Sequence, residues 1–235
     1  MMGLSYECEP IMRKLETHFA GQIDFRYAMG LLVRNVHDFM MPEDYADTEA
    51  ESIVRYNARL ATDRFLYNLR YATIVDTRST TRLDEILKVV SQTGIDEKRF
   101  LQHYRDSSAE SALDGDLTRM HALGIHALPA YLLAYEGKQM LIRHLIGFDA
   151  FSEVIRRLSD GSIRPLPVEQ SLSSVRQLLE QHPLISPIEL REALDFRTTD
   201  EIRAFVQPLI DSGEIAIREV PHGYFIVNIQ KEKQI

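Results

Sequence analysis

The feature that most limits the fold of this chain is a change of hydrophobic period near Gly124. Before that glycine, apolar residues recur mostly every three or four positions, which is the spacing of amphipathic helices. After it, residues 130–136 and 139–145 are predicted to be two strands joined by a tight turn at Gly137-Lys138. Residues 148–158 then return to the helical period. The order predicts a mixed α/β fold, in which helices cover a sheet.

The N-terminal segment is predicted to be a helix over residues 4–20, followed by a strand over 22–29. One face of the helix carries a repeated set of apolar residues, namely Leu4, Cys8, Ile11, Leu15 and Phe19. Pro10 is expected to bend this helix, since proline removes a backbone donor. The strand is inferred from the alternation of Ile23, Phe25 and Tyr27 with polar residues.

The middle of the chain is predicted to be helical. A long helix is expected from about residue 49 to 71, and Gly94 is expected to end the next one. The apolar stripes of the three shorter helices contain Leu83, Ile86, Leu87 and Val90, then Phe100, Leu101 and Tyr104, and last Leu113, Leu117 and Met120.

A linker is expected between residues 160 and 167, where Gly, Ser and Pro interrupt both periods. Beyond it, the pattern predicts three helices and then a hairpin made by residues 214–219 and 224–229. Ser186-Pro187-Ile188-Glu189 has the spacing of a capping box and predicts the start of the second helix.

Composition narrows the function classes. The net charge is −8, which argues against general affinity for nucleic acids or anionic membranes. One cysteine excludes an internal disulfide and a multi-cysteine metal site, and the eight histidines show no ligand spacing, so no metal is predicted. No membrane-spanning apolar run or signal peptide is visible, and a cytoplasmic location is expected.

Three segments resemble the DsbA-like family of thioredoxin-fold proteins: residues 5–16, 21–32 and 124–151. In the third, an apolar run leads into the position of the family's cis-proline, here Pro129 preceded by Leu128. The resemblance implies an α/β thioredoxin-like fold with a helical insertion. Its core would span residues 1–47 and 118–160, and the insertion residues 48–117. Residues 168–230 resemble a small winged-helix domain.

The redox centre of this family is a Cys-x-x-Cys pair at the start of the first helix, where the helix dipole stabilises a thiolate. Its second cysteine lies five residues before the proline that Pro10 matches, so the pair corresponds here to Met2 and Ser5. A thioether and a hydroxyl cannot exchange disulfides. Cys8 belongs to the apolar stripe and is interpreted as a small buried residue. No catalytic residue is therefore assigned.

The family fold also has a central strand before the first helix, and too few residues precede the helix here to form it. Three explanations stay open: a gene start upstream of Met1, another segment or subunit in that place, or an open sheet. We favour the first, which predicts an apolar, β-branched run encoded in frame upstream of Met1.

For the winged-helix segment, DNA recognition is the usual role. Residues 168–235 carry seven Lys or Arg and eleven Asp or Glu, a net charge of −4, and the third helix has Arg203 as its basic residue. We therefore expect packing or protein docking by this domain rather than DNA binding.

The leading hypothesis is a cytoplasmic adaptor that binds a protein or peptide without redox chemistry. Its groove would contain Met2, Ser5, Tyr6, Leu128 and Pro129. The alternative is an enzyme, either a thiol-disulfide oxidoreductase or isomerase, or a glutathione-dependent isomerase or transferase. Kappa-class glutathione transferases and 2-hydroxychromene-2-carboxylate isomerases share the fold, but the serine they use matches Met2. No cofactor is predicted, with glutathione left open, no membrane contact is expected, and a homodimer is left open.

Overall fold

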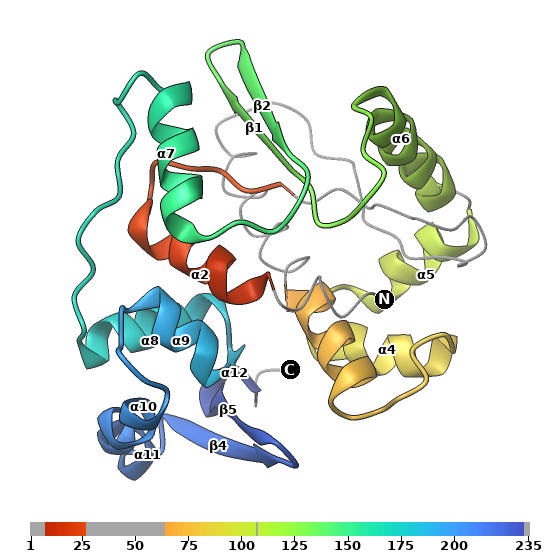
Figure 1. The fold of residues 1–235 in the computed structure, drawn as a ribbon. Coiled ribbons are helices and arrows are strands. Elements are labelled where there is room, and N and C mark those ends of the chain that lie inside the picture. The colour runs from red at the N-terminus through yellow and green to blue at the C-terminus, as the bar shows by residue number, and fades with distance from the viewer. Residues whose placement is uncertain (1–7, 27–63, 107, 233–235) are drawn as a thin grey trace. The chain divides into compact units, whose positions relative to one another are not determined.

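The computed structural model describes residues 8–26, 64–106 and 108–232, which belong to two compact units (Figure 1). The first unit contains residues 1–25 and 129–234, and the second contains residues 26–128 with Ile235. The expectations for Leu4, for residues 27–29 of the predicted strand and for residues 49–63 of the long helix lie outside the described residues.

The first helix of the described chain, α2, spans Glu9–His18. Its predicted apolar face is confirmed, because Cys8, Leu15 and Phe19 are buried. The prediction that Pro10 bends the helix is wrong. Pro10 lies in the first turn of α2, where the backbone N–H has no intrahelical partner in any case. The helix ends as expected in a turn at residues 19–22, with Gly21 at a φ of +71°.

The predicted hairpin is formed by β1 (Tyr131–Tyr135) and β2 (Lys138–Ile142), which pair antiparallel. The turn lies at Glu136-Gly137, one residue earlier than predicted, since Tyr135 pairs directly with Lys138. Helix α7 (Phe148–Leu158) follows the hairpin, as its period predicted. The core of this part is a cluster from α2, β2 and α7: Leu15, Phe19, Ile142, Phe151 and Ile155.

The predicted strand at 22–29 is not formed over residues 22–26, which have no regular secondary structure. Among the described residues of this part the sheet has two strands, β1 and β2. Ile23 and Phe25 nevertheless pack against the same buried cluster as Tyr131 and Leu133 of β1. The Gln22 side chain instead bonds the backbone of Arg164, donating to its carbonyl at 2.9 Å and accepting from its N–H at 3.3 Å.

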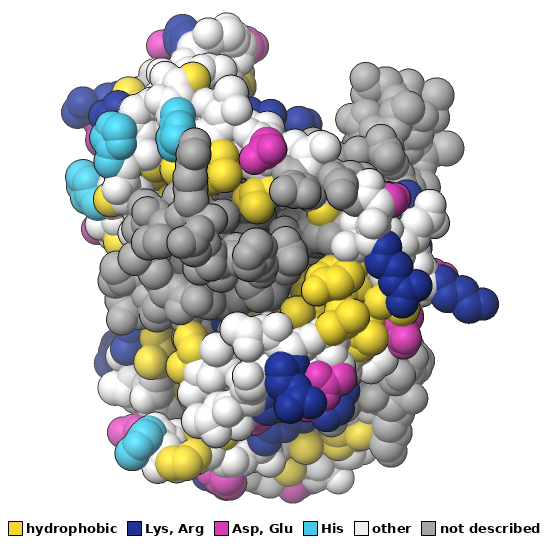
Figure 2. Space-filling model, turned by 90° about the vertical axis from the view of Figure 1, so that its right-hand side faces the viewer, with side chains coloured by type: hydrophobic (Ala, Val, Ile, Leu, Met, Phe, Trp, Pro, Cys, Tyr) yellow, Lys and Arg dark blue, Asp and Glu magenta, His cyan; other side chains and the backbone are white. Residues whose placement is uncertain are grey.

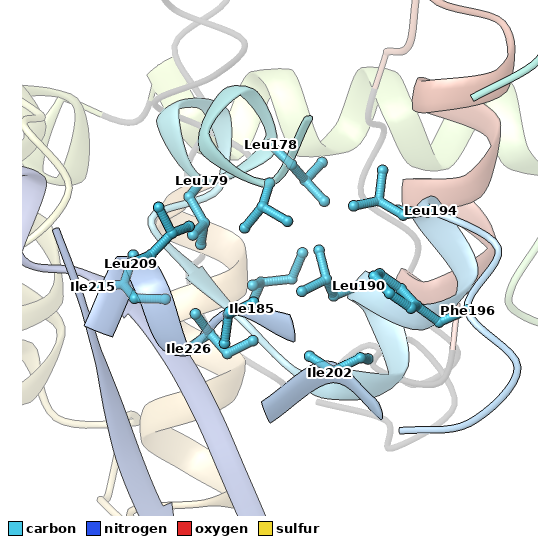
Figure 3. Packing of buried hydrophobic residues seen from close by; sticks show 13 residues of the cluster. Leu178, Leu179, Ile185, Leu190, Leu194, Phe196, Ile202, Leu209, Ile215 and Ile226 are labelled. Atoms are coloured by element: carbon cyan, nitrogen blue, oxygen red, sulfur yellow. The ribbon is translucent and has the colours of Figure 1, made fainter. Parts of the chain in front are cut away.

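The C-terminal part of the first unit combines short helices with a small sheet. Its elements in chain order are α8 (Leu172–Gln181), β3 (Leu184–Ile185), α9 (Pro187–Ala193), α10 (Asp200–Phe205), α11 (Gln207–Asp211), β4 (Ile215–Val220), β5 (Gly223–Asn228) and α12 (Ile229–Glu232). The strand order is β3-β5-β4, with antiparallel pairing throughout. Leu179, Leu190, Ile202 and Ile226 belong to the buried cluster at its centre (Figure 3).

Two local features of this part connect directly to sequence. The capping box at the start of α9 is present: Ser186 Oγ accepts from the Glu189 N–H, and the Glu189 carboxylate accepts from the Ser186 N–H. The third helix was predicted as one element but is divided into α10 and α11 at Val206. Pro208 explains the break, because proline cannot donate to a carbonyl four residues earlier and its ring clashes there.

The described residues of the second unit form helices and the turns that connect them. Residues 64–74 are helical, three residues beyond the predicted end at 71. The three shorter helices are confirmed as α4 (Leu83–Ser91), α5 (Glu97–Arg105) and α6 (Ser108–Ala122). Their core includes Phe65, Leu69, Ile86, Val89 and Val90. No helix among residues 8–26, 64–106 and 108–232 is long and apolar enough to cross a bilayer.

Candidate functional site

The N-terminal end of α2 is the place where the sequence resemblance put the site. Of the predicted groove residues, Met2, Ser5 and Tyr6 lie outside the described residues. Leu128 and Pro129 are half-buried and lie in a bend directly before β1. The division between the two units falls between them, with Leu128 in the second unit and Pro129 in the first. The site is therefore described from the first unit alone.

Tyr131 connects the start of β1 to the start of α2. Its hydroxyl lies beside the Cys8 thiol, and the Glu9 carboxylate is close enough to influence it. Burial raises the pKa of Tyr131 well above its usual value, and the nearby Cys8 thiol and the charge of Glu9 add to the increase. Tyr131 is thus a neutral phenol at any ordinary pH. The contact brings the strand that follows Pro129 next to the N-terminal end of α2.

Cys8 occupies the residue before the first turn of α2, with helical backbone angles and no side-chain cap. The prediction that it is a small buried residue is confirmed, because it is 6% exposed and not disulfide-bonded. A thiol must reach its partner sulfur to exchange disulfides, and the chain provides no second cysteine to resolve a mixed disulfide. As it stands, this end of α2 holds a shielded single thiol.

Glu9 supplies a negative charge at the same helix end. It is 3% exposed, and its Oε2 lies 2.8 Å from Nη2 of Arg13 one turn along α2. A carboxylate in the first turn is favoured by the helix dipole, and the arginine offsets the cost of burying it. The arrangement can position groups and hold charge, while the thiol that the described residues of this helix end contain, Cys8, is shielded from solvent.

Sequence reasoning missed Tyr131 and Glu9 as parts of this region. A signal for Tyr131 existed, since it follows Pro129 by two residues and therefore begins the strand beside the predicted groove. No signal existed for Glu9, because an acidic residue at a helix start is ordinarily solvated.

The described residues of the second unit also contain a surface hollow. An open hollow of about 580 Å³ lies on α5, and its walls are polar side chains of that helix and the residue before it: Asp96, Lys98, Arg99, Gln102 and His103. Basic and acidic side chains are interspersed on the face drawn in Figure 2. No group of three His, Cys, Asp or Glu side chains within the described ranges is arranged to hold a metal ion.

Comparison with known proteins identifies the family but no individual relative. A search of curated proteins finds no match. Residues 2–145 match the family whose model is described as thioredoxin. The match contains α2, Pro129 and both strands of the β1–β2 hairpin, and it covers more than half of the chain. On this evidence the chain belongs to the thioredoxin family.

Proposed function

We propose that this thioredoxin-family chain is a DsbA-like adaptor of the cytoplasm that binds a peptide or protein and carries out no thiol-disulfide exchange. The observation that carries the proposal is that the chain has a single, buried cysteine. The chain has one cysteine, and that cysteine is buried against Tyr131 at the start of α2. Exchange of the family's type uses two neighbouring thiols, the first of them accessible. A fold that keeps the family's frame without this pair retains its binding surface.

The binding surface is proposed to lie around Leu128 and Pro129 at the N-terminal end of α2. Both residues are half-buried, and β1 begins two residues after Pro129. Backbone groups at the start of such a strand can pair with an extended peptide, so that affinity comes from main-chain hydrogen bonds. Met2, Ser5 and Tyr6 are proposed to line the same groove.

We further propose that residues 168–232 form a winged helix that serves in packing rather than DNA recognition. The chain order α8, β3, α9, α10, α11, β4 and β5, in which the three strands form one antiparallel sheet, supports the first part. The charges support the second part. Arg203, the basic residue of α10, lies 2.8 Å from Glu219 and 5.5 Å from the Tyr224 ring centroid, so it is already engaged within the domain.

A redox assay tests the absence of exchange chemistry. We expect the full chain to leave the rate of insulin reduction by dithiothreitol at the rate without protein. Turnover above that background would contradict the proposal. The Cys8→Ala variant would then assign the activity, because loss of turnover in it would identify Cys8 as the reacting thiol.

A binding titration tests the positive part of the proposal. The probe is reduced and alkylated insulin B chain carrying a fluorescein label, followed by anisotropy. We expect saturable binding that Pro129→Ala weakens about tenfold, a loss of about 1.4 kcal/mol. Pro165→Ala, which changes an exposed proline of the linker, is the matched control and should bind as the unmodified chain does. No saturable binding, or equal losses in both variants, would overturn the proposal.

The glutathione-dependent alternative has a separate readout. Calorimetric titration with reduced glutathione should give no heat of binding if the adaptor proposal holds. Binding in the micromolar range would favour a glutathione-dependent enzyme instead.

A further inference from the structure

Helix α2 has a second partner besides the β1–β2 hairpin and α7. In the first unit it lies between α7 and α9, so one side faces the thioredoxin-type core and the other faces the C-terminal part (Figure 1). Thr17 Oγ1 donates to the Ala193 carbonyl at 2.9 Å and thereby joins the two helices directly.

The centre of the α2–α9 contact is a buried arginine. The Arg13 side chain is fully buried, and among the described residues it pairs with three carboxylates: Glu9 at 2.8 Å, Glu16 at 2.7 Å and Glu189 at 3.4 Å. His182 Nε2 lies 3.1 Å from Arg13 Nη1 and 2.9 Å from Glu16 Oε2. We call these five residues the Arg13 cluster. Glu189 and His182 come from the C-terminal part, so the balance of charge around Arg13 depends on docking.

Glu189 has two roles in this arrangement. Its Oε2 accepts from the Ser186 N–H and hydroxyl at 2.9 and 2.7 Å, which caps α9, while its Oε1 faces Arg13. The start of α9 and its contact with α2 therefore depend on the same carboxylate.

The apolar cores on the two sides of the contact are separate. The buried cluster of the C-terminal part runs from Val175 to Ile226 and draws on α8 to β5. The buried cluster on the other side draws on α2, β2 and α7. Charged and polar side chains fill the space between them, including Glu9, Arg13 and Glu189, each 3% exposed or less. Each side of the contact therefore has an apolar core of its own.

Ion pairs are also found at the rim of the α2–α9 contact. Lys14 Nζ lies 2.7 Å from Asp195 Oδ1 and 3.7 Å from Glu192 Oε2. The linker is bound to the C-terminal end of α2, because the Leu166 N–H donates to the His18 carbonyl at 2.6 Å. The linker and α9 are thus held by one helix.

We propose that the α2–α9 contact is an ionic latch that opens without unfolding either side. Residues 168–232 stay docked on α2 while the Arg13 cluster is complete, and they separate as a folded module when its charge balance is broken. The open form presents the acidic face of α9 and the charged face of α2 to solvent. The test of the latch uses no ligand, so its result can be separated from the result of the peptide-binding test.

The test combines limited proteolysis with hydrogen exchange on the full chain. In the Arg13→Met variant the carboxylates of Glu9, Glu16 and Glu189 lose their contact with Arg13. We expect cleavage by the glutamate-specific protease Glu-C after the exposed Glu169, between the linker and α8, to become at least tenfold faster. Amide protection in β5, inside the C-terminal core, should stay at the level of the unmodified chain. Glu189→Gln breaks the contact from the other side and keeps a side chain suited to the capping box, so it serves if Arg13→Met does not fold.

The control is Arg203→Met, which removes an exposed ion pair of the same module and should leave cleavage unchanged. Unchanged cleavage in both cluster variants would overturn the latch. So would a parallel loss of protection in β5, because the module would then unfold when it separates.

Discussion

At the scale of single residues, burial decides what each polar group of α2 can do. Cys8, Glu9 and Arg13 follow one another within two turns, and all three are buried. The thiol packs as an apolar group, the carboxylate serves as a counter-ion, and the guanidinium connects segments that are 176 positions apart in sequence. Burial shields all three from solvent, whereas the reacting thiol of an enzyme has to be accessible.

The burial of Cys8 predicts its reactivity. Since the thiol is 6% exposed, we expect it to be unreactive toward DTNB in the folded chain and to react at once in 6 M guanidinium. Native labelling should follow the rate of opening and accelerate with urea. Cleavage of one equivalent of reagent within the mixing time under native conditions would show that the thiol is accessible.

Sequence alone could predict Cys8 and could not predict Arg13. The apolar stripe through Cys8, Leu15 and Phe19 is a local signal, because residues three or four apart share a helix face. Arg13 lies among Glu and Lys residues on a different face, which is the usual appearance of a solvated surface. Its partners Glu189 and His182 are close only after folding.

At the scale of elements, local signals predicted the helices well and the strands unevenly. Helix α7 and the capping box of α9 follow from period and capping chemistry, which short stretches of sequence contain. The strand expected at 22–29 had the right alternation, but a strand also needs a neighbour to bond with. The two-residue strand β3 had no pattern of its own and exists because it pairs with β5.

The two-residue turn of the β1–β2 hairpin leads to a prediction about glycines. Gly137 has a φ of +81°, and a Cβ there would meet no atom within 4 Å, so strain alone opposes a side chain. We expect Gly137→Ala to lower the free energy of unfolding by about 1 kcal/mol.

Gly115 is the matched control, because it lies inside α6 without a positive φ and in open space. Gly115→Ala should raise the free energy of unfolding by up to about 1 kcal/mol through helix propensity. Urea titration of both variants measures the two signs. A gain for Gly137→Ala would show that the turn differs from the one described.

At the scale of the whole molecule, the sequence resemblance predicted the family. It did not predict how the C-terminal part of the first unit packs on α2. The family match ends at residue 145, and the segment beyond it contributes Glu189 and His182, two of the partners of Arg13. A boundary could be expected from Gly and Pro in the linker, while residues 129–234 belong to one compact unit. The docking of the C-terminal part on α2 could not, because it depends on long-range pairing of charges that are common on protein surfaces.

His18, at the rim of the α2–α9 contact, makes the stability of the chain depend on pH. Burial lowers the pKa of His18 below its usual 6.5, an effect that Asp195 opposes and Lys14 strengthens. The unfolded chain therefore binds a proton at His18 more readily than the folded chain. By linkage, the contribution of His18 to stability is complete above about pH 6.5 and is lost as the pH falls through the lower value of the folded state.

We expect the urea midpoint of the full chain to fall between pH 7.5 and pH 5.5, and His18→Gln to fall less over the same interval because glutamine does not titrate. His222→Gln, at the exposed tip of the β4–β5 hairpin, should keep the slope of the unmodified chain. An identical slope in His18→Gln would mean that burial of His18 does not control its protonation. A smaller slope would link the protonation of one α2 side chain to the stability of the unit in which the C-terminal part is docked.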